Sequence, residues 1–140
     1  MMAEALEQAL PADILIVGFQ EAIELSSWNV VYGADEAKVL AAAKQWVADS
    51  LEGYVCFAEA NLIGLVTLCF CKVEMLGTAS LQEIAVTTVK TGDVGQAIGL
   101  NLMKMGNKGG VLVRWRIHDT TYLVANCHLA AHQDNVRERV

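Results

Sequence analysis

Three short segments carry side chains that could act together on a phosphorylated substrate. Glu21 stands shortly after an apolar run, and a carboxylate at the end of a buried strand lies where ligands and Mg²⁺ collect. Lys108 lies in the glycine-rich stretch 106–110, and His128 and His132 follow an apolar run near the C-terminus. An ammonium group and imidazoles suit phosphate contact and proton transfer. Taken alone, Glu21 is also typical of an ordinary solvated carboxylate after a strand, and the glycine-rich stretch is also typical of a flexible hairpin loop.

Two other chemistries are suggested by the segment around His128. Cys127 and His128 are adjacent, but neighbouring residues of a strand point to opposite faces, so a Cys–His dyad is not expected. His128 and His132 have a spacing that could bind zinc, but no C-x-x-C pair accompanies them. The cysteines sit in apolar, strand-like segments and are expected to be reduced core residues; they are Cys56, Cys69, Cys71 and Cys127.

The charge pattern favours a small anionic ligand over a nucleic acid. The net charge of −6 argues against broad nucleic-acid binding. No acidic residue occurs between Val94 and His118, a stretch that contains Lys104, Lys108, Arg114 and Arg116. This stretch predicts a local basic patch, although an uneven surface charge would give the same pattern.

The hydrophobic periodicity predicts an α+β chain with sheet-on-sheet packing. No apolar run reaches the roughly 18 residues of a membrane span, and the acidic N-terminus is unlike a secretory signal, so a cytoplasmic location is expected. Two helices are predicted, over Met2–Leu10 and from an N-cap at Asp35 to about Leu51. Strands are predicted at Ile14–Val17 (buried on both faces), Tyr54–Ala58, Ile63–Cys71, Ile84–Val89, Val111–Ile117 and Tyr122–His128, the last two joined by a turn at Asp119–Thr120.

Taken in order, the segments resemble the motifs of one family, the inositol polyphosphate 5-phosphatases, which have the deoxyribonuclease I-like fold. The likeness runs from about Pro11 to Arg139. It rests on three matches, which are Asp13–Glu21, Thr91–Gly92 followed by Gly106–Val111, and Asn126–His132 followed by Arg137–Arg139.

The resemblance implies a fold, a reaction and roles for particular residues. Residues 1–140 would form an incomplete 5-phosphatase catalytic domain, a partial sandwich of β-sheets flanked by helices. The full-length parent would hydrolyse the 5-phosphate of phosphoinositides or soluble inositol polyphosphates with Mg²⁺, leaving peripheral membrane contact open and nucleic acid unexpected. By the same resemblance, Glu21 would ligate Mg²⁺ and His128 would contact the scissile phosphate, while Asn107, Lys108 and His132 would lie near the substrate phosphates.

Several family features are missing from this sequence. No "WN" strand precedes Pro11, and the later "GDxN", "DR" and "SDH" segments are absent. The stretch Asp93–Met105 is longer than expected and is interpreted as an insertion. Little or no activity is therefore expected from this chain alone. Two alternatives are a nuclease of the same fold and a non-catalytic product that binds inositol phosphates or a protein partner.

Overall fold

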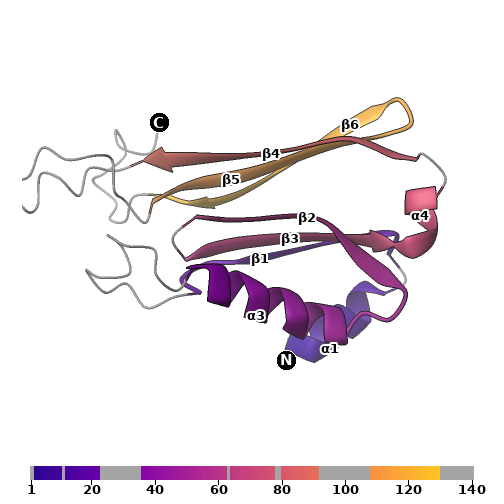
Figure 1. Cartoon of the computed structure of the whole chain (residues 1–140), viewed down its shortest axis with the longest axis horizontal. Helices are drawn as coiled ribbons and strands as arrows, with labels where there is room; N and C mark the ends of the chain where they lie inside the picture. The colour runs from indigo at the N-terminus through magenta and orange to yellow at the C-terminus, as the bar shows by residue number, and fades with distance from the viewer. Residues whose placement is uncertain are drawn as a thin grey trace, which may run out of the picture.

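The computed structural model of the chain consists of two antiparallel sheets packed face to face, with helices on the outer face of one of them (Figure 1). It describes residues 2–10, 12–22, 36–62, 64–77, 80–91 and 108–129. Each sheet has three strands. The predicted α+β class and the sheet-on-sheet packing are both confirmed. Within these described ranges, no helix is long and apolar enough to cross a membrane.

The first sheet contains β1 (Ile14–Phe19), β2 (Tyr54–Leu62) and β3 (Leu65–Lys72) in the order β1-β3-β2. The central strand β3 is buried along nearly its whole length, as its continuous apolar sequence predicts. β1 was predicted to be buried on both faces, and this is wrong. It pairs with β3 alone and forms an edge of the described sheet, which leaves the Ile16 side chain 38% exposed.

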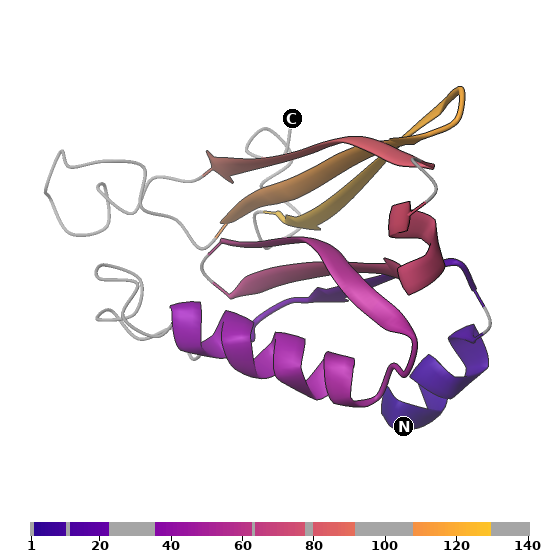
Figure 2. The ribbon, with the colours of Figure 1, turned by 45° about the vertical axis from the view of Figure 1, so that its right-hand side comes forward.

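Two helices cover the outer face of this sheet, as Figure 2 shows. They are α1 (Met2–Ala9) and α3 (Glu36–Asp49), close to the predicted bounds. Val47 and Leu51 are buried against Leu15, Val66, Leu68 and Phe70 of the sheet, which confirms the apolar face predicted for the longer helix. Gly53 has the positive φ of 81° expected of a glycine just past a helix end. A short helix, α4 (Val73–Gly77), was not predicted.

The second sheet contains β4 (Leu81–Thr91), β5 (Lys108–Ile117) and β6 (Thr120–His128) in the order β4-β5-β6. Val111, Val113 and Trp115 are buried, while Arg114 between them is exposed, so the side chains of β5 alternate between the core and the surface. The β5–β6 hairpin is confirmed, but Ile117 pairs with Thr120. The turn therefore lies at residues 118–119, one residue earlier than predicted.

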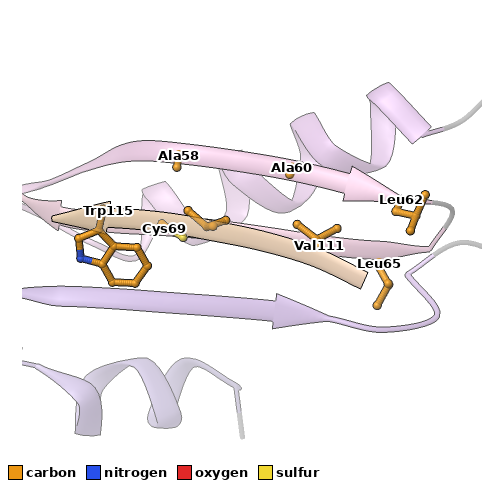
Figure 3. Packing of buried hydrophobic residues seen from close by; sticks show 8 residues of the cluster. Ala58, Ala60, Leu62, Leu65, Cys69, Val111 and Trp115 are labelled. Atoms are coloured by element: carbon orange, nitrogen blue, oxygen red, sulfur yellow. The ribbon is translucent and has the colours of Figure 1, made fainter. Parts of the chain in front are cut away.

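The core between the sheets consists of small and medium-sized apolar side chains (Figure 3). Val111, Val113 and Trp115 of the second sheet face Ala58, Ala60, Leu62, Leu65 and Cys69 of the first. The small alanines leave room for Trp115, whose ring meets Phe57 edge-on and stacks on Tyr122, with centroid distances of 5.7 Å in both cases.

The cysteines fall into two environments. Cys69 and Cys71 are buried and Cys56 is half-buried, in line with the predicted core role. Cys127 is exposed, so that prediction is wrong for this residue. Its neighbours Asn126 and His128 are half-buried, and Cys127 points the opposite way.

Thiol reactivity should separate these environments. Burial raises the pKa of the Cys69 thiol to about 12, so its reactive thiolate is scarce at neutral pH. We expect iodoacetamide at pH 7.5 to alkylate Cys127 in the folded protein and to spare Cys69 and Cys71. Peptide mass spectrometry after a timed quench measures the labelling, and denatured protein serves as the control. Labelling of Cys69 as fast as Cys127 would contradict the packing.

Candidate active site

Three of the predicted site residues come together at one end of the sandwich. Glu21 follows the end of β1, Lys108 begins β5 and His128 ends β6. The Lys108 Nζ atom lies 2.6 Å from His128 Nε2, and Glu21 Oε1 lies 3.7 Å from the same nitrogen. Residues distant in the sequence thus form one cluster. The other two predicted residues, Asn107 and His132, lie outside the described residues.

The contact between Lys108 and His128 defines which nitrogen carries the proton of the imidazole. An ammonium group has only donors, so at 2.6 Å His128 Nε2 accepts the hydrogen bond from Lys108. A neutral ring in this arrangement carries its proton on Nδ1. The separation of 3.7 Å between Glu21 Oε1 and His128 Nε2 is beyond hydrogen-bonding range. Glu21 therefore interacts with the Lys108–His128 pair through its charge.

Glu21 is held in place by its two neighbours. The Gln20 side chain donates from Nε2 to the carbonyl oxygen of Cys127 over 2.9 Å. The backbone N–H of Ala22 donates to the carbonyl oxygen of Gly64, in the β2–β3 turn, over 3.0 Å. Glu21 itself has a positive φ of 53°, which is uncommon for a residue with a Cβ atom. Its side chain is 67% exposed and is open to a ligand.

The described residues offer a partial site for a divalent cation. Among them, no three His, Cys, Asp or Glu side chains gather as a metal cluster. Mg²⁺ is commonly bound through one or two carboxylates, with water and substrate phosphate completing the shell. The exposed, anchored carboxylate of Glu21 fits that demand as one protein ligand. The alternative zinc site needs His132, which lies outside the described residues.

The described part of the glycine-rich stretch forms a strand and not the loop that its sequence suggests. Lys108, Gly109 and Gly110 are part of strand β5, so the interpretation as a flexible loop is wrong for these residues. Gly109 has a φ of 153°, and a Cβ atom there would overlap the Val89 carbonyl oxygen and lie 2.8 Å from Leu62 Cδ2. Its missing side chain lets β4 and β2 pack closely beside Lys108. Gly106 and the stretch Asp93–Met105 lie outside the described residues.

The predicted basic patch does not assemble at this site. Arg114 and Arg116 bind Glu83 at 3.0 and 3.1 Å. They alternate with the inward-facing Val113 and Trp115, so they lie on the outer face of the second sheet. Arg114 is also six residues from Lys108, or roughly 20 Å along the strand. Of the described basic residues in that stretch, Lys108 is the one that reaches the cluster, and Lys104 lies outside the described residues.

Sequence reasoning missed the roles of Gln20 and Asn126, which join the two sheets beside the cluster. Asn126 Nδ2 lies 3.1 Å from the Val66 carbonyl oxygen, 3.2 Å from Thr67 Oγ1 and 3.3 Å from the Phe19 carbonyl oxygen. One signal was present in the sequence, since Asn126 and His128 share a face of their strand. Its partners come from segments about 60 and 107 residues away, which no local pattern indicates.

The chain belongs to the endonuclease/exonuclease/phosphatase family, because the model of "Endonuclease/Exonuclease/phosphatase family 2" matches residues 2–140. Among curated proteins it is similar to synaptojanin-2 of Homo sapiens, with 33% identity over 95% of this chain. It is also similar to the type II inositol 1,4,5-trisphosphate 5-phosphatase of Mus musculus, with 34% identity over 94% of this chain. The chain spans only 8% and 12% of these two relatives.

A solved structure agrees with these relatives. The inositol polyphosphate 5-phosphatase domain of SPsynaptojanin, in complex with inositol (1,4)-bisphosphate and a calcium ion, superposes with a TM-score of 0.59 at 31% identity. The match covers 91% of this chain and 34% of that chain. The predicted resemblance and the deoxyribonuclease I-like fold class are confirmed.

The Lys108–His128 contact can be tested by NMR. We expect His128 Nε2 to accept a hydrogen bond from Lys108, which requires the ring proton to lie on Nδ1. Long-range ¹H–¹⁵N spectra distinguish the two ring nitrogens. Lys108→Met should shift the Nε2 signal of His128, whereas Lys38→Met, on the exposed surface of α3, should not. An Nε2–H tautomer in the unmodified protein would contradict the contact.

Gly109 and Gly53 form a matched pair for a stability test. Both have positive φ, but a Cβ at Gly53 meets nothing within 4 Å. We expect Gly53→Ala to lower the free energy of unfolding by about 1–2 kcal/mol. Gly109→Ala should cost about 3 kcal/mol or more, because β4 or Leu62 must move. Urea unfolding measures both, and equal losses would contradict the close packing at Gly109.

Proposed function

We propose that the natural protein carrying this chain hydrolyses the 5-phosphate of phosphoinositides or soluble inositol polyphosphates in a Mg²⁺-dependent reaction. The observation that carries the proposal is the convergence of Glu21, Lys108 and His128 at the ends of three strands. It occurs in a chain whose relatives include an inositol 1,4,5-trisphosphate 5-phosphatase. A carboxylate, an ammonium group and an imidazole are the groups that a metal-assisted phosphate hydrolysis requires.

Each described residue would have a separate task. Glu21 would hold Mg²⁺, which supplies charge neutralisation at the phosphate oxygens when it is bound. The Lys108 ammonium, a compact charge with three donors, would bind phosphate oxygens and stabilise charge that builds on them. His128 would contact the scissile phosphate beside Lys108. By family resemblance, Asn107 and His132 would add contacts to the substrate phosphates.

The charge balance supports a small phosphomonoester over a nucleic acid. The protein carries a net charge of −6, and the two described arginines of the expected basic patch are bound to Glu83 instead. A polyanion needs several phosphate contacts spread over a surface. One inositol phosphate needs a few converging donors, which matches a cluster at the end of a sandwich.

For the 140-residue chain by itself we propose binding without turnover as the second candidate. The observation that favours it is the coverage, since the matching 5-phosphatase domain chain is about three times longer. Catalytic groups that act as a unit lose nearly all activity when several are missing. Lys108 and His128 would still offer contacts to phosphate. Calorimetry with inositol 1,4-bisphosphate tests this, and release of phosphate by the isolated chain would overturn it.

The activity test uses the natural protein with inositol 1,4,5-trisphosphate and with the same head group in lipid vesicles. We expect phosphate release that requires added Mg²⁺ and is abolished by chelation. Glu21→Gln removes the carboxylate charge with little change in shape, and His128→Ala removes the imidazole. Each should lower kcat by roughly 10²-fold or more, in line with the loss of one electrostatic contact in an active site.

The matched control is Glu59→Gln, which removes an exposed carboxylate on β2 that pairs with Lys44, away from the cluster. It should leave kcat within about twofold. Plasmid DNA should remain intact under the same conditions. Nicking of plasmid that is lost in Glu21→Gln would replace the phosphatase proposal with a nuclease. Full activity of Glu21→Gln would remove Glu21 from the metal site.

A further inference from the structure

We propose that Asn126 is a positioning residue, which holds His128 at its observed distance from Glu21. We also propose that position 18 must be glycine because the Asn126 side chain occupies the space where a Cβ atom would lie. The inference rests on the proposed function for its kinetic consequence, but its structural part stands independently. Asn126 lies on β6, two residues before His128, and its carboxamide reaches across the sandwich to β1 and β3. It connects the strands from which the cluster is built.

The site depends on two strands that are weakly restrained. His128 ends β6 and Glu21 follows β1, and each strand pairs with one neighbour in the described sheets. An edge strand can shift or fray more readily than a central one, because one side of its backbone has no ladder. The distance between His128 and Glu21 therefore needs restraints from outside the ladders, in addition to the bond from Gln20 to the Cys127 carbonyl oxygen.

The Asn126 carboxamide supplies that restraint from three directions. Nδ2 faces the carbonyl oxygens of Phe19 and Val66 and the hydroxyl oxygen of Thr67, all at 3.1–3.3 Å. Two of these acceptors are carbonyl oxygens that cannot donate, so the amide nitrogen rather than Oδ1 must face them. Phe19 stands two residues before Glu21, so one contact ties the carboxamide directly to the segment that holds the metal-binding carboxylate.

The Asn126 contact includes a buried polar group, the hydroxyl of Thr67. Thr67 is fully buried, at 0% exposure, and is the buried polar residue of the described core. It faces the second sheet at a position where β3 otherwise presents Leu65 and Cys69. A buried hydroxyl is costly to leave without a partner, and so is the carbonyl oxygen of a buried residue such as Val66. The two N–H donors of Asn126 Nδ2 are shared among the hydroxyl and the two carbonyl oxygens.

Gly18 completes the arrangement. A Cβ atom at this position would lie 3.2 Å from Asn126 Nδ2 and 3.5 Å from its Cγ. The backbone of β1 therefore passes directly beside the carboxamide, and any larger residue would push Asn126 and β6 away. The glycine is needed here for close approach and not for its backbone freedom, since its φ is not positive.

A double-mutant cycle in the natural protein tests the pair without relying on activity. Gly18→Ala alone should lower the thermal unfolding midpoint by several degrees, because the new methyl group meets the carboxamide. In an Asn126→Ala background that methyl group has space, so Gly18→Ala should cause little further loss. Equal losses in both backgrounds would overturn the role assigned to Gly18.

Isosteric and kinetic variants separate positioning from simple packing. Asn126→Asp keeps the shape of the side chain but turns acceptors toward the carbonyl oxygens. It should therefore lower stability at least as much as Asn126→Ala does. Either change should lower kcat by about 10²-fold with KM changed far less, as a displacement of about 1 Å can. Both should shift the His128 Nε2 signal. The control is Thr121→Ala, on the exposed outer face of β6. It should change neither kcat nor the His128 Nε2 signal.

The outcomes distinguish this inference from the proposed function. A natural protein without phosphatase activity that still shows the Gly18–Asn126 coupling and the shifted His128 signal supports the positioning role and refutes the proposed function. An active enzyme in which Asn126→Asp retains normal kcat refutes the positioning role and leaves the function intact. Loss of stability in Asn126→Ala with unchanged kcat and an unchanged His128 signal would also refute it, since the residue would then be purely structural.

Discussion

The alignment of the two sheets depends on a polar contact within an otherwise apolar interface. Burial of apolar side chains drives the sheets together, but it is non-directional and tolerates small sliding motions. The side chains between the sheets are mostly alanine, valine and leucine, which allow several similar packings. The bonds from Asn126 to Val66, Thr67 and Phe19 have fixed lengths and directions, and they select one alignment. That alignment determines where the ends of β1 and β6 meet.

The candidate site is a consequence of how the strands end. Antiparallel pairing brings the start of β5 and the end of β6 to the same place, so Lys108 lies beside His128. Face-to-face packing brings the end of β1 to the same end of the sandwich, which adds Glu21. Arg114 and Arg116 lie farther along β5 and on its other face, where Glu83 neutralises part of their charge. Position along the strand therefore separates Lys108, in the cluster, from Arg114 and Arg116, which pair with Glu83.

Local patterns in the sequence predicted the elements well, because each depends on neighbours within a few residues. The buried strand β3, the apolar face of α3 and the β5–β6 hairpin all follow from hydrophobic period and turn residues. The errors concern non-local structure. Nothing within Ile14–Val17 indicates that β1 lies at a sheet edge. The sequence around the glycines at 109 and 110 is equally compatible with a loop and with a strand. The prediction that residues 1–140 are an incomplete domain stays a prediction.

The candidate site was predicted more fully than the contacts that hold it. Glu21, Lys108 and His128 were singled out by residue type and family motif, and all three meet. Gln20 and Asn126 were within the same motifs but had no assigned role, since most of their partners are carbonyl oxygens, which every residue possesses. Because every residue has a backbone carbonyl, the sequence does not indicate which carbonyl accepts a given hydrogen bond. Supporting residues of this kind become visible only when the fold shows which backbone they approach.

The spacing of the Asn126-x-His128 pair has a physical explanation in the pleat of β6. Side chains two residues apart share a face of a strand and stand about 6.6 Å apart. Asn126 is far enough inside the sandwich to reach Thr67, while His128, one repeat farther on, stands where the interface between the sheets ends. A spacing of one would send the imidazole to the outer face with Cys127. A spacing of four would place it about 13 Å from the carboxamide, too far for Asn126 to control its position. The two-residue spacing is therefore the shortest that lets one residue anchor the strand and the other join the cluster with Lys108 and Glu21.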